Sequence, residues 1–276
     1  MNTTIPTQEQ MLDVLCRPSM RPHLDTIIQE RILRLEAVFD TLVGQRTNDI
    51  EDTPSIPRQT YRLLRRITEN IHLWGDRKPI DAHEKAQEIQ TTLTNDVVPT
   101  VMQLLETHSN TPVHVYHEPA VVTHYAYAHL FSNIIYGDMH HEVPMRPMLG
   151  HELSHHLVRT THNIPHEDYS AFLEGHAIGV EEHLLREDAV RHVSTTHAAL
   201  RFIRLQDLMQ MYATILDRTG TPDEMFSTIS GQIFGITGRA HDPPYGIGHA
   251  LFAIAELKHG PGIYAESLRE PRVVLA

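Results

Sequence analysis

The sequence predicts a mainly α protein of the α+β class, with a small β-sheet beside the helix that carries its most distinctive residues. Apolar residues recur near a 3.6-residue period through much of the first hundred positions, which favours amphipathic helices. Residues 112–137 are rich in strand-forming residues. A pattern typical of helices resumes near Pro147 and continues through most of the remaining sequence.

Length and composition bound the class of protein. The chain has 276 residues and a mass of 31.5 kDa, enough for one large domain or two small lobes with a substantial core. With 41% apolar and 21% charged residues it is neither a disordered tail, a collagen nor a disulfide scaffold. A formal charge of −12 argues against sequence-independent nucleic-acid binding, which depends on Lys and Arg neutralising phosphates.

Cysteine content and hydropathy bear on the compartment. The single cysteine, Cys16, cannot form an internal disulfide, which fits a reducing compartment. No window reaches the ~18 uninterrupted apolar residues of a membrane span, and residues 1–14 lack the basic and apolar blocks of a secretory signal. We therefore expect a cytoplasmic protein without a membrane partner.

The first two helices are expected before residue 75. Apolar residues in 24–42 follow a helical period that ends near Gly44, and the polar stretch 45–57 reads as a loop. A second helix is expected over 61–73, and Gly75 would end it.

A third helix is expected over about 80–107, interrupted before Pro99 because proline removes a helical hydrogen-bond donor. The texture changes after His108, so the sequence predicts an N-terminal helical lobe at 1–110. The region 111–276 would carry the functional site, and the two would together form one compact unit.

The expected sheet lies in 112–137. Residues 112–117 alternate like a short strand, 120–128 are rich in β-formers, and 133–137 would form a third strand. The segment 126–130 would also suit a helix, which leaves its assignment open.

A metal-binding pattern stands out at residues 151–155. His151-Glu152-x-x-His155 places two imidazoles about 40° apart around a helix and ~6 Å apart along it, so both can reach one ion. Glu152 can approach a water on that ion without being a ligand itself. Pro147 suits the first turn of the required helix.

A third metal-binding residue is expected, because catalytic zinc takes three protein ligands and keeps one position open. With 22 histidines in the chain, the two-histidine pattern has a chance expectation of about 0.1 occurrences. A second His six residues after His155 would need Gly at 158 and His at 161, where Val158 and Thr161 stand instead. Asp168 is possible, and Glu174 would fit on a returning helix.

That returning helix is expected to begin after 163–165 and to include 172–182. Gly175 and Gly179 are costly inside a helix, about 1 kcal/mol each relative to Ala. They indicate either close backbone packing near a site or a crowded helix crossing. Glu181 shares the face of Glu174 and is expected to be solvated or salt-bridged, with a role in orienting a ligand imidazole as the alternative.

The pattern resembles the gluzincin zinc metallopeptidases, which combine His-Glu-x-x-His with a downstream Glu. Leu173-Glu-Gly-His-Ala177 is similar to the Asn-Glu-Gly-Phe-Ala segment of their aminopeptidase branch, with Leu173 in place of Asn. The resemblance covers about 30 contiguous residues, and no Gly-Ala-Met-Glu-Asn exopeptidase segment stands upstream. It implies a zincin-like fold and a Zn²⁺ ion held by His151, His155 and Glu174.

The same resemblance implies hydrolysis of a peptide or small protein substrate, with Glu152 as general base and acid. An oxyanion donor is then expected downstream. The Gly- and Pro-rich stretch 238–250 concentrates Arg239, Tyr245 and His249, of which Tyr245 is the first choice for this donor and His249 the second.

Two other readings remain open. Zinc could be structural and closed by a fourth protein ligand, for which His176 or Asp168 would serve. Alternatively, His151 and His155 could fall together by chance in a helical interaction protein.

Overall fold

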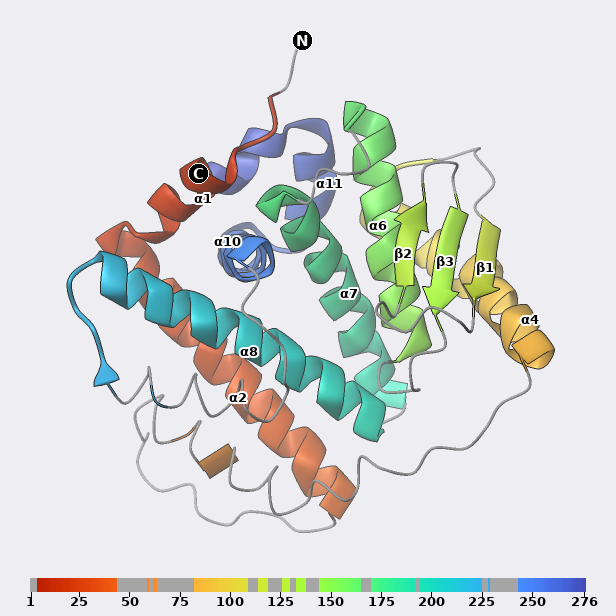
Figure 1. Ribbon diagram of the computed structural model, residues 1–276, viewed down its shortest axis with the longest axis horizontal. Coiled ribbons are helices and arrows are strands. Elements are labelled where there is room, and N and C mark those ends of the chain that lie inside the picture. The colour runs from red at the N-terminus through yellow and green to blue at the C-terminus, as the bar shows by residue number, and fades with distance from the viewer. Residues whose placement is uncertain are drawn as a thin grey trace.

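A computed structural model gives the arrangement of the helices around the predicted site (Figure 1). The residues it describes are 4–43, 59, 62–63, 82–108, 114–118, 126–129, 133–137, 144–164, 170–191, 194–224, 228 and 243–276.

Helices dominate this part of the chain. In order they are α1 (Gln8–Leu15), η1 (Pro18–Met20), α2 (Arg21–Val43), α4 (Ala82–Thr92), η3 (Leu93–Val97), α5 (Val98–Leu104), α6 (Met145–His162), α7 (Ala171–Arg191), α8 (Thr195–Arg218), α10 (Pro243–His259), α11 (Gly262–Arg269) and η4 (Pro271–Leu275).

The predicted helix over 24–42 is confirmed as the greater part of α2, which ends at Val43. The interruption expected before Pro99 is also confirmed, because η3 is a π-helical segment that ends two residues before it. Of the helix expected over 61–73, only 62–63 lie within the described residues, and both are helical.

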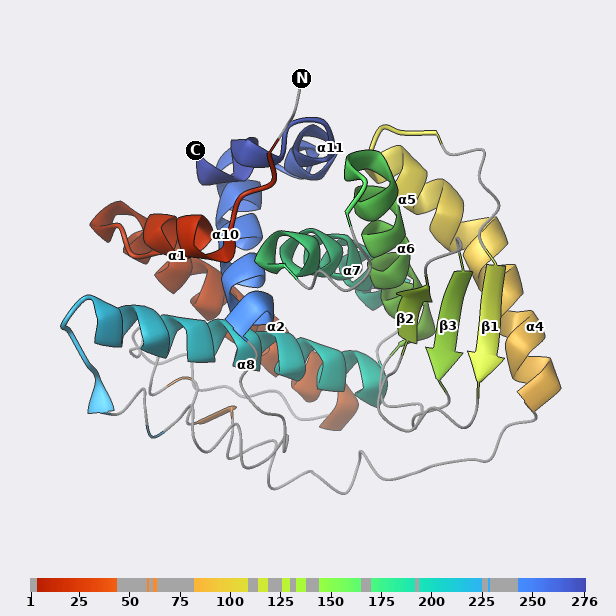
Figure 2. The same ribbon diagram turned by 45° about the horizontal axis from the view of Figure 1, so that its top comes forward.

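Three short strands form a sheet at one side of the molecule (Figures 1 and 2). They are β1 (His114–Glu118), β2 (Ala126–His129) and β3 (Asn133–Gly137), in the order β1-β3-β2. β3 pairs in parallel with β1, with His114 opposite Asn133, and antiparallel with β2, with Ala126 opposite Tyr136.

The α+β, zincin-like fold class is therefore a wrong prediction, and mainly α is the correct description. The strands have five, four and five residues, whereas helices make up most of the described chain, so the sheet is a minor part of the fold. Where side chains are described, the apolar core comes from the helices and their immediate ends. The strand expected over 120–128 is described only from Ala126, where β2 begins.

Helix α7 lies at the centre of the helical body, between α6 and α10 (Figure 2). Every residue from Ala171 to Glu182 is buried, which is typical of a helix covered on all sides. Helices α1 and α2 pack against α10, and α2 also lies along α8. The division at residue 110 stays a prediction.

Glycines let α7 and α10 cross at close range. A Cβ atom at Gly248 would lie 2.1 Å from the carbonyl oxygen of Ala171 and 2.5 Å from the backbone nitrogen of Gly175. A Cβ at Gly175 would lie 2.5 Å from the carbonyl oxygen of Gly248. Of the two explanations for Gly175, the structure shows the crowded helix crossing.

A buried ion pair joins three helices on another side of α7. Glu182 of α7 pairs with Arg31 of α2 and lies 3.3 Å from Nε2 of His249 on α10. Burial alone would raise the pKa of Glu182, but Arg31 and His249 outweigh it and hold the pKa well below its usual range. The carboxylate therefore stays ionised in the core.

None of the helices in the described part of the chain combines the length and the apolar character needed to cross a bilayer.

We expect Gly248→Ala to lower the free energy of unfolding by about 1–3 kcal/mol, because the added methyl group overlaps backbone atoms that cannot move aside easily. Urea denaturation measures this loss. Gly262→Ala is the control, since a Cβ there meets no atom within 4 Å. Equal effects of the two substitutions would contradict the close crossing.

Glu182→Gln is expected to cost about 3–5 kcal/mol at pH 7, because Arg31 would stay buried without its charged partner. An ionised Glu182 stabilises the fold above the ordinary carboxyl pKa of 4.5, and this contribution is lost as pH falls below that value. The difference between parent and variant should therefore shrink from pH 7 to pH 3 in urea denaturation.

The control is Glu106→Gln, which removes an exposed ion pair with Arg269 and should cost no more than about 1 kcal/mol. A loss from Glu182→Gln that stays the same at both pH values would show that the carboxylate charge is not responsible.

Candidate metal centre

Helix α6 carries the His-Glu-x-x-His residues, as the sequence predicts. It follows Pro144 and ends where Asn163 adopts a left-handed conformation with φ of 53°. His151, Glu152 and His155 are all buried on this helix. Pro147 is its third residue, where a missing N–H leaves no intrahelical hydrogen bond unmade.

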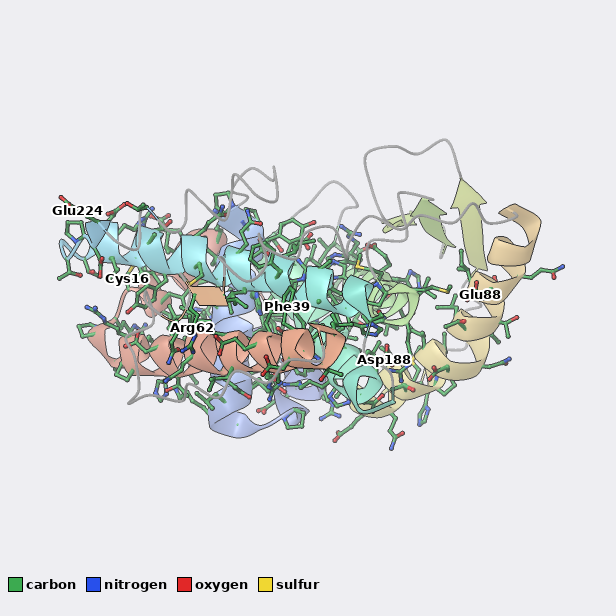
Figure 3. The ribbon with its side chains drawn as sticks, turned by 90° about the horizontal axis from the view of Figure 1, so that it is seen from below. Cys16, Phe39, Arg62, Glu88, Asp188 and Glu224 are labelled. Atoms are coloured by element: carbon green, nitrogen blue, oxygen red, sulfur yellow. The ribbon has the colours of Figure 1, made fainter. Side chains whose placement is uncertain are left out.

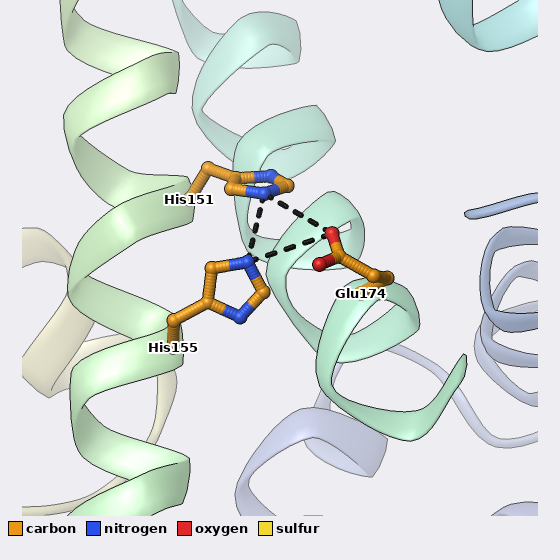
Figure 4. A group of neighbouring side chains, drawn as sticks. All are labelled: His151, His155 and Glu174. Carbon is orange, nitrogen blue, oxygen red and sulfur yellow. Dashed lines mark hydrogen bonds and ion pairs between the residues drawn. The ribbon is translucent and has the colours of Figure 1, made fainter. Parts of the chain in front are cut away.

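Glu174 of α7 meets both imidazoles (Figure 4). Its Oε2 atom lies 3.5 Å from Nε2 of His151 and 3.5 Å from Nε2 of His155, while the two nitrogens are 3.0 Å apart. The carboxylate is 1% exposed. The structure thus brings together the three residues that were predicted to share a metal ion.

These distances fit a small divalent cation. In a tetrahedral zinc site with bonds of about 2.0–2.1 Å, neighbouring ligand atoms lie about 3.3 Å apart. Oε2 of Glu174 is buried and makes no hydrogen bond within the described structure. A buried carboxylate oxygen without a partner is costly, and a cation between it and the two nitrogens would satisfy it.

The charges of these side chains also favour a bound cation. Burial alone would lower the pKa of His151, but the carboxylates of Glu174 and Glu181 outweigh it and raise the pKa to about 9. Burial alone would raise the pKa of Glu174, but the imidazoles of His155 and His151 outweigh it and hold it well below its usual range. A metal ion requires neutral imidazoles, so it would take the place of the proton.

A second carboxylate, that of Glu181, lies next to the other ring nitrogen of His151. Oε2 of Glu181 lies 3.0 Å from Nδ1 of His151, on the ring edge away from Glu174. Arg204 of α8 donates to both oxygens of Glu181 at 2.6 and 2.5 Å, and to Asp207 at 3.2 Å. Such a carboxylate fixes the tautomer and the ring orientation of a metal-binding histidine.

The sequence placed Glu181 correctly on the face of Glu174 and favoured a solvated or salt-bridged role. The salt bridge is present, but the side chain is fully buried and also faces His151. Arg204 was missed entirely, since it lies on another helix and no local pattern connects it with residue 181.

His176 is a structural residue rather than a ligand. Its Nε2 lies 3.1 Å from the backbone carbonyl of Tyr264 and must donate, so Nδ1 accepts the hydroxyl hydrogen of Ser154 at 2.7 Å. Burial is the main cause of a lowered pKa, about 4. This neutral imidazole, on α7, joins α6 to α11 through Ser154, the residue before His155, and Tyr264.

The predicted oxyanion donors both lie on α10. His249 is buried against Glu182, and the ring of Tyr245 lies 5.9 Å from the guanidinium carbon of Arg204. Tyr245 therefore lies near Arg204, which pairs with Glu181, and His249 lies against the Glu182–Arg31 pair. Arg239 and Asp168 lie outside the described residues, so their roles stay predictions.

No known protein family, curated protein or solved structure matches this chain. The function has to be argued from the site itself.

We expect the purified protein to retain about one equivalent of zinc after dialysis and Glu174→Ala to lose it, because two imidazoles alone hold the ion poorly. Glu181→Gln should weaken zinc binding about 10–100-fold, because the imidazole of His151 loses its charged support. Competition with a chromophoric zinc chelator measures both effects.

The control is His259→Asn, since His259 is exposed at the end of α10 and should leave zinc affinity unchanged. Zinc retention by Glu174→Ala at the parent level would rule out Glu174 as a ligand.

Proposed function

We propose that this protein is a zinc-dependent hydrolase that cleaves peptide bonds. The observation that carries the proposal is the buried group of His151, His155 and Glu174, with the carboxylate of Glu152 next to the first ligand on the same helix. No further His, Cys, Asp or Glu joins this group in the described part of the chain. Three protein ligands with a free position are typical of catalytic zinc.

When bound, zinc supplies Lewis acidity, which makes water a stronger acid and a carbonyl a better electrophile. The chain's own residues then supply binding and proton transfer. His151, His155 and Glu174 would hold the ion, and Glu181 with Arg204 would keep the ring of His151 in place.

Glu152 is proposed as the group that moves the proton. Glu152 follows His151 directly and is therefore turned about 100° around α6. It lies beside the side of the helix that carries His151 and His155, not on it. It would accept a proton from the attacking water and deliver that proton to the leaving amine nitrogen.

Tyr245 remains the proposed donor to the developing oxyanion, with His249 as the alternative. Both stand near the start of α10, which packs against α7. The proposal that the substrate is a peptide rests on the resemblance of the motif to gluzincins. The residue types at the site support hydrolysis at a carbonyl group in general.

A structural zinc site is the second candidate, because the ligand side chains are buried to an unusual degree. His151, His155 and Glu174 are 3%, 5% and 1% exposed. A bound ion would then join α6 to α7 without reaching a substrate. Zinc-dependent folding without hydrolysis would favour this candidate.

Glu152→Gln is expected to keep zinc affinity and to reduce peptide hydrolysis by at least about 100-fold, because the amide cannot accept the proton. Hydrolysis of a fluorogenic peptide series of graded length, with zinc content determined on the same samples, measures both properties.

The matched control is Glu266→Gln on α11, which should leave activity unchanged since this exposed carboxylate contacts no metal ligand in the described structure. Unaltered hydrolysis by Glu152→Gln would exclude the proposed role. A zinc-loaded parent without activity on any peptide would favour the structural site.

A further inference from the structure

Arginines from three helices surround one turn of α7, residues 182–186. Arg31 of α2 pairs with Glu182, which begins the turn. Arg186, which ends it, pairs with Glu256 of α10 at 2.5 Å. Arg201 of α8 donates to the backbone carbonyl of Leu185 at 3.0 Å.

The helices that supply these arginines lie side by side. Figure 3 shows α8 running along α2, with Asp188, near the end of α7, beside them. Arg34, one turn after Arg31 on α2, adds a further cation and pairs with Glu30 of its own helix. The cluster of Arg31, Arg34, Arg186 and Arg201 is called the arginine cluster below.

Among the described residues, Arg201 is the cation of this cluster that lacks a counter-ion. The carboxylates of Glu30, Glu182 and Glu256 are each engaged by another arginine. Within the described structure Arg201 forms no ion pair, and its only hydrogen bond goes to the carbonyl of Leu185. In the described part of the chain, four guanidinium groups thus share three carboxylates.

Buried donors are left over in the same place. Nε of Arg201 and Nε of Arg31 are both buried and make no hydrogen bond in the part of the chain that the structure describes. A buried guanidinium donor without an acceptor carries a desolvation cost, which an incoming anion would remove.

Three neighbouring arginines act on Arg201, although the chain as a whole carries a formal charge of −12. Burial is the main cause of a lowered pKa at Arg201, about 10. The carboxylate of Glu182 opposes this shift, and the charges of Arg31, Arg34 and Arg186 add to it. Repulsion from three neighbouring arginines would be relieved by negative charge held between them.

We propose that the arginine cluster is a binding site for an oxyanion, the phosphate or carboxylate group of a small ligand, with Arg201 as its principal contact. The planar guanidinium fork matches two oxygens of such a group, and charge-assisted hydrogen bonds of this kind are about twice as strong as neutral ones. Arg31 would contribute its free Nε donor, and Arg34 and Arg186 would contribute charge. The site does not depend on the proposed hydrolase activity.

Isothermal titration calorimetry of the full-length, zinc-loaded protein tests this site, with inorganic phosphate and acetate as separate titrants at constant ionic strength. We expect saturable binding of at least one of the two anions, and the titrant with the higher affinity distinguishes a phosphate from a carboxylate ligand. Arg201→Gln should weaken that binding about tenfold or more. Arg201→Lys, which keeps the charge but not the fork, should fall between Arg201→Gln and the parent.

Arg269→Gln is the matched control, because Arg269 is an exposed arginine at the end of α11 that pairs with Glu106. Its anion affinity should equal that of the parent. The titration is repeated after treatment with a chelator, since anion binding to zinc would disappear and binding to the arginine cluster would persist.

Absence of saturable binding by the parent would overturn the proposal. So would unchanged affinity in Arg201→Gln, or complete loss of binding after chelation. If Arg201→Gln does not fold, as judged by circular dichroism, the comparison of parent with Arg201→Lys decides, and equal affinities would overturn the proposal.

Discussion

The structure depends on a helix that is buried on every side and yet carries several ionisable groups. Over residues 171–182, α7 places three carboxylates in the core, those of Glu174, Glu181 and Glu182. A buried carboxylate needs a cationic or hydrogen-bonding partner, because removing its charge from water is costly. Glu181 and Glu182 have arginine partners from α8 and α2, whereas Glu174 faces two imidazoles and no arginine among the described residues. A buried carboxylate that faces two imidazoles, in place of an arginine, is what defines the candidate metal centre.

This requirement also explains how the neighbouring helices are arranged. Glu182 draws in Arg31 and His249, so that α2 and α10 are joined to α7 through one carboxylate. Glu181 connects α8 to the imidazole of His151 on α6 through Arg204. Two adjacent residues of α7, Glu181 and Glu182, therefore link the candidate metal centre to the outer helices. The arginine cluster lies beside Glu182 and holds one more arginine than carboxylates among the described residues.

The metal group was predictable because its spacing is local. His151 and His155 share a helix face by the geometry of one turn, and Glu174 could be found from the resemblance of a 30-residue segment. The third helix was likewise predictable, since Pro99 limits where a regular helix can continue. How large a part of the fold the sheet forms was not predictable, because short alternating segments do not reveal whether they build a layer of the core. The contacts of Tyr245 and His249 were also hidden, since they depend on how α10 crosses α7.

The sequence by itself determined which side chains can hold a cation and on which helices they stand, since helical period and residue chemistry are properties of neighbouring positions. Only the tertiary structure decided that Glu174 returns to within 3.5 Å of both imidazoles and that Glu181 lies behind one of them. It also decided that Arg201 forms no ion pair with any residue the structure describes. These features arise from the packing of helices distant in sequence, where close contacts such as Gly175 against Gly248 set the distance between the helices and no local pattern encodes the partner.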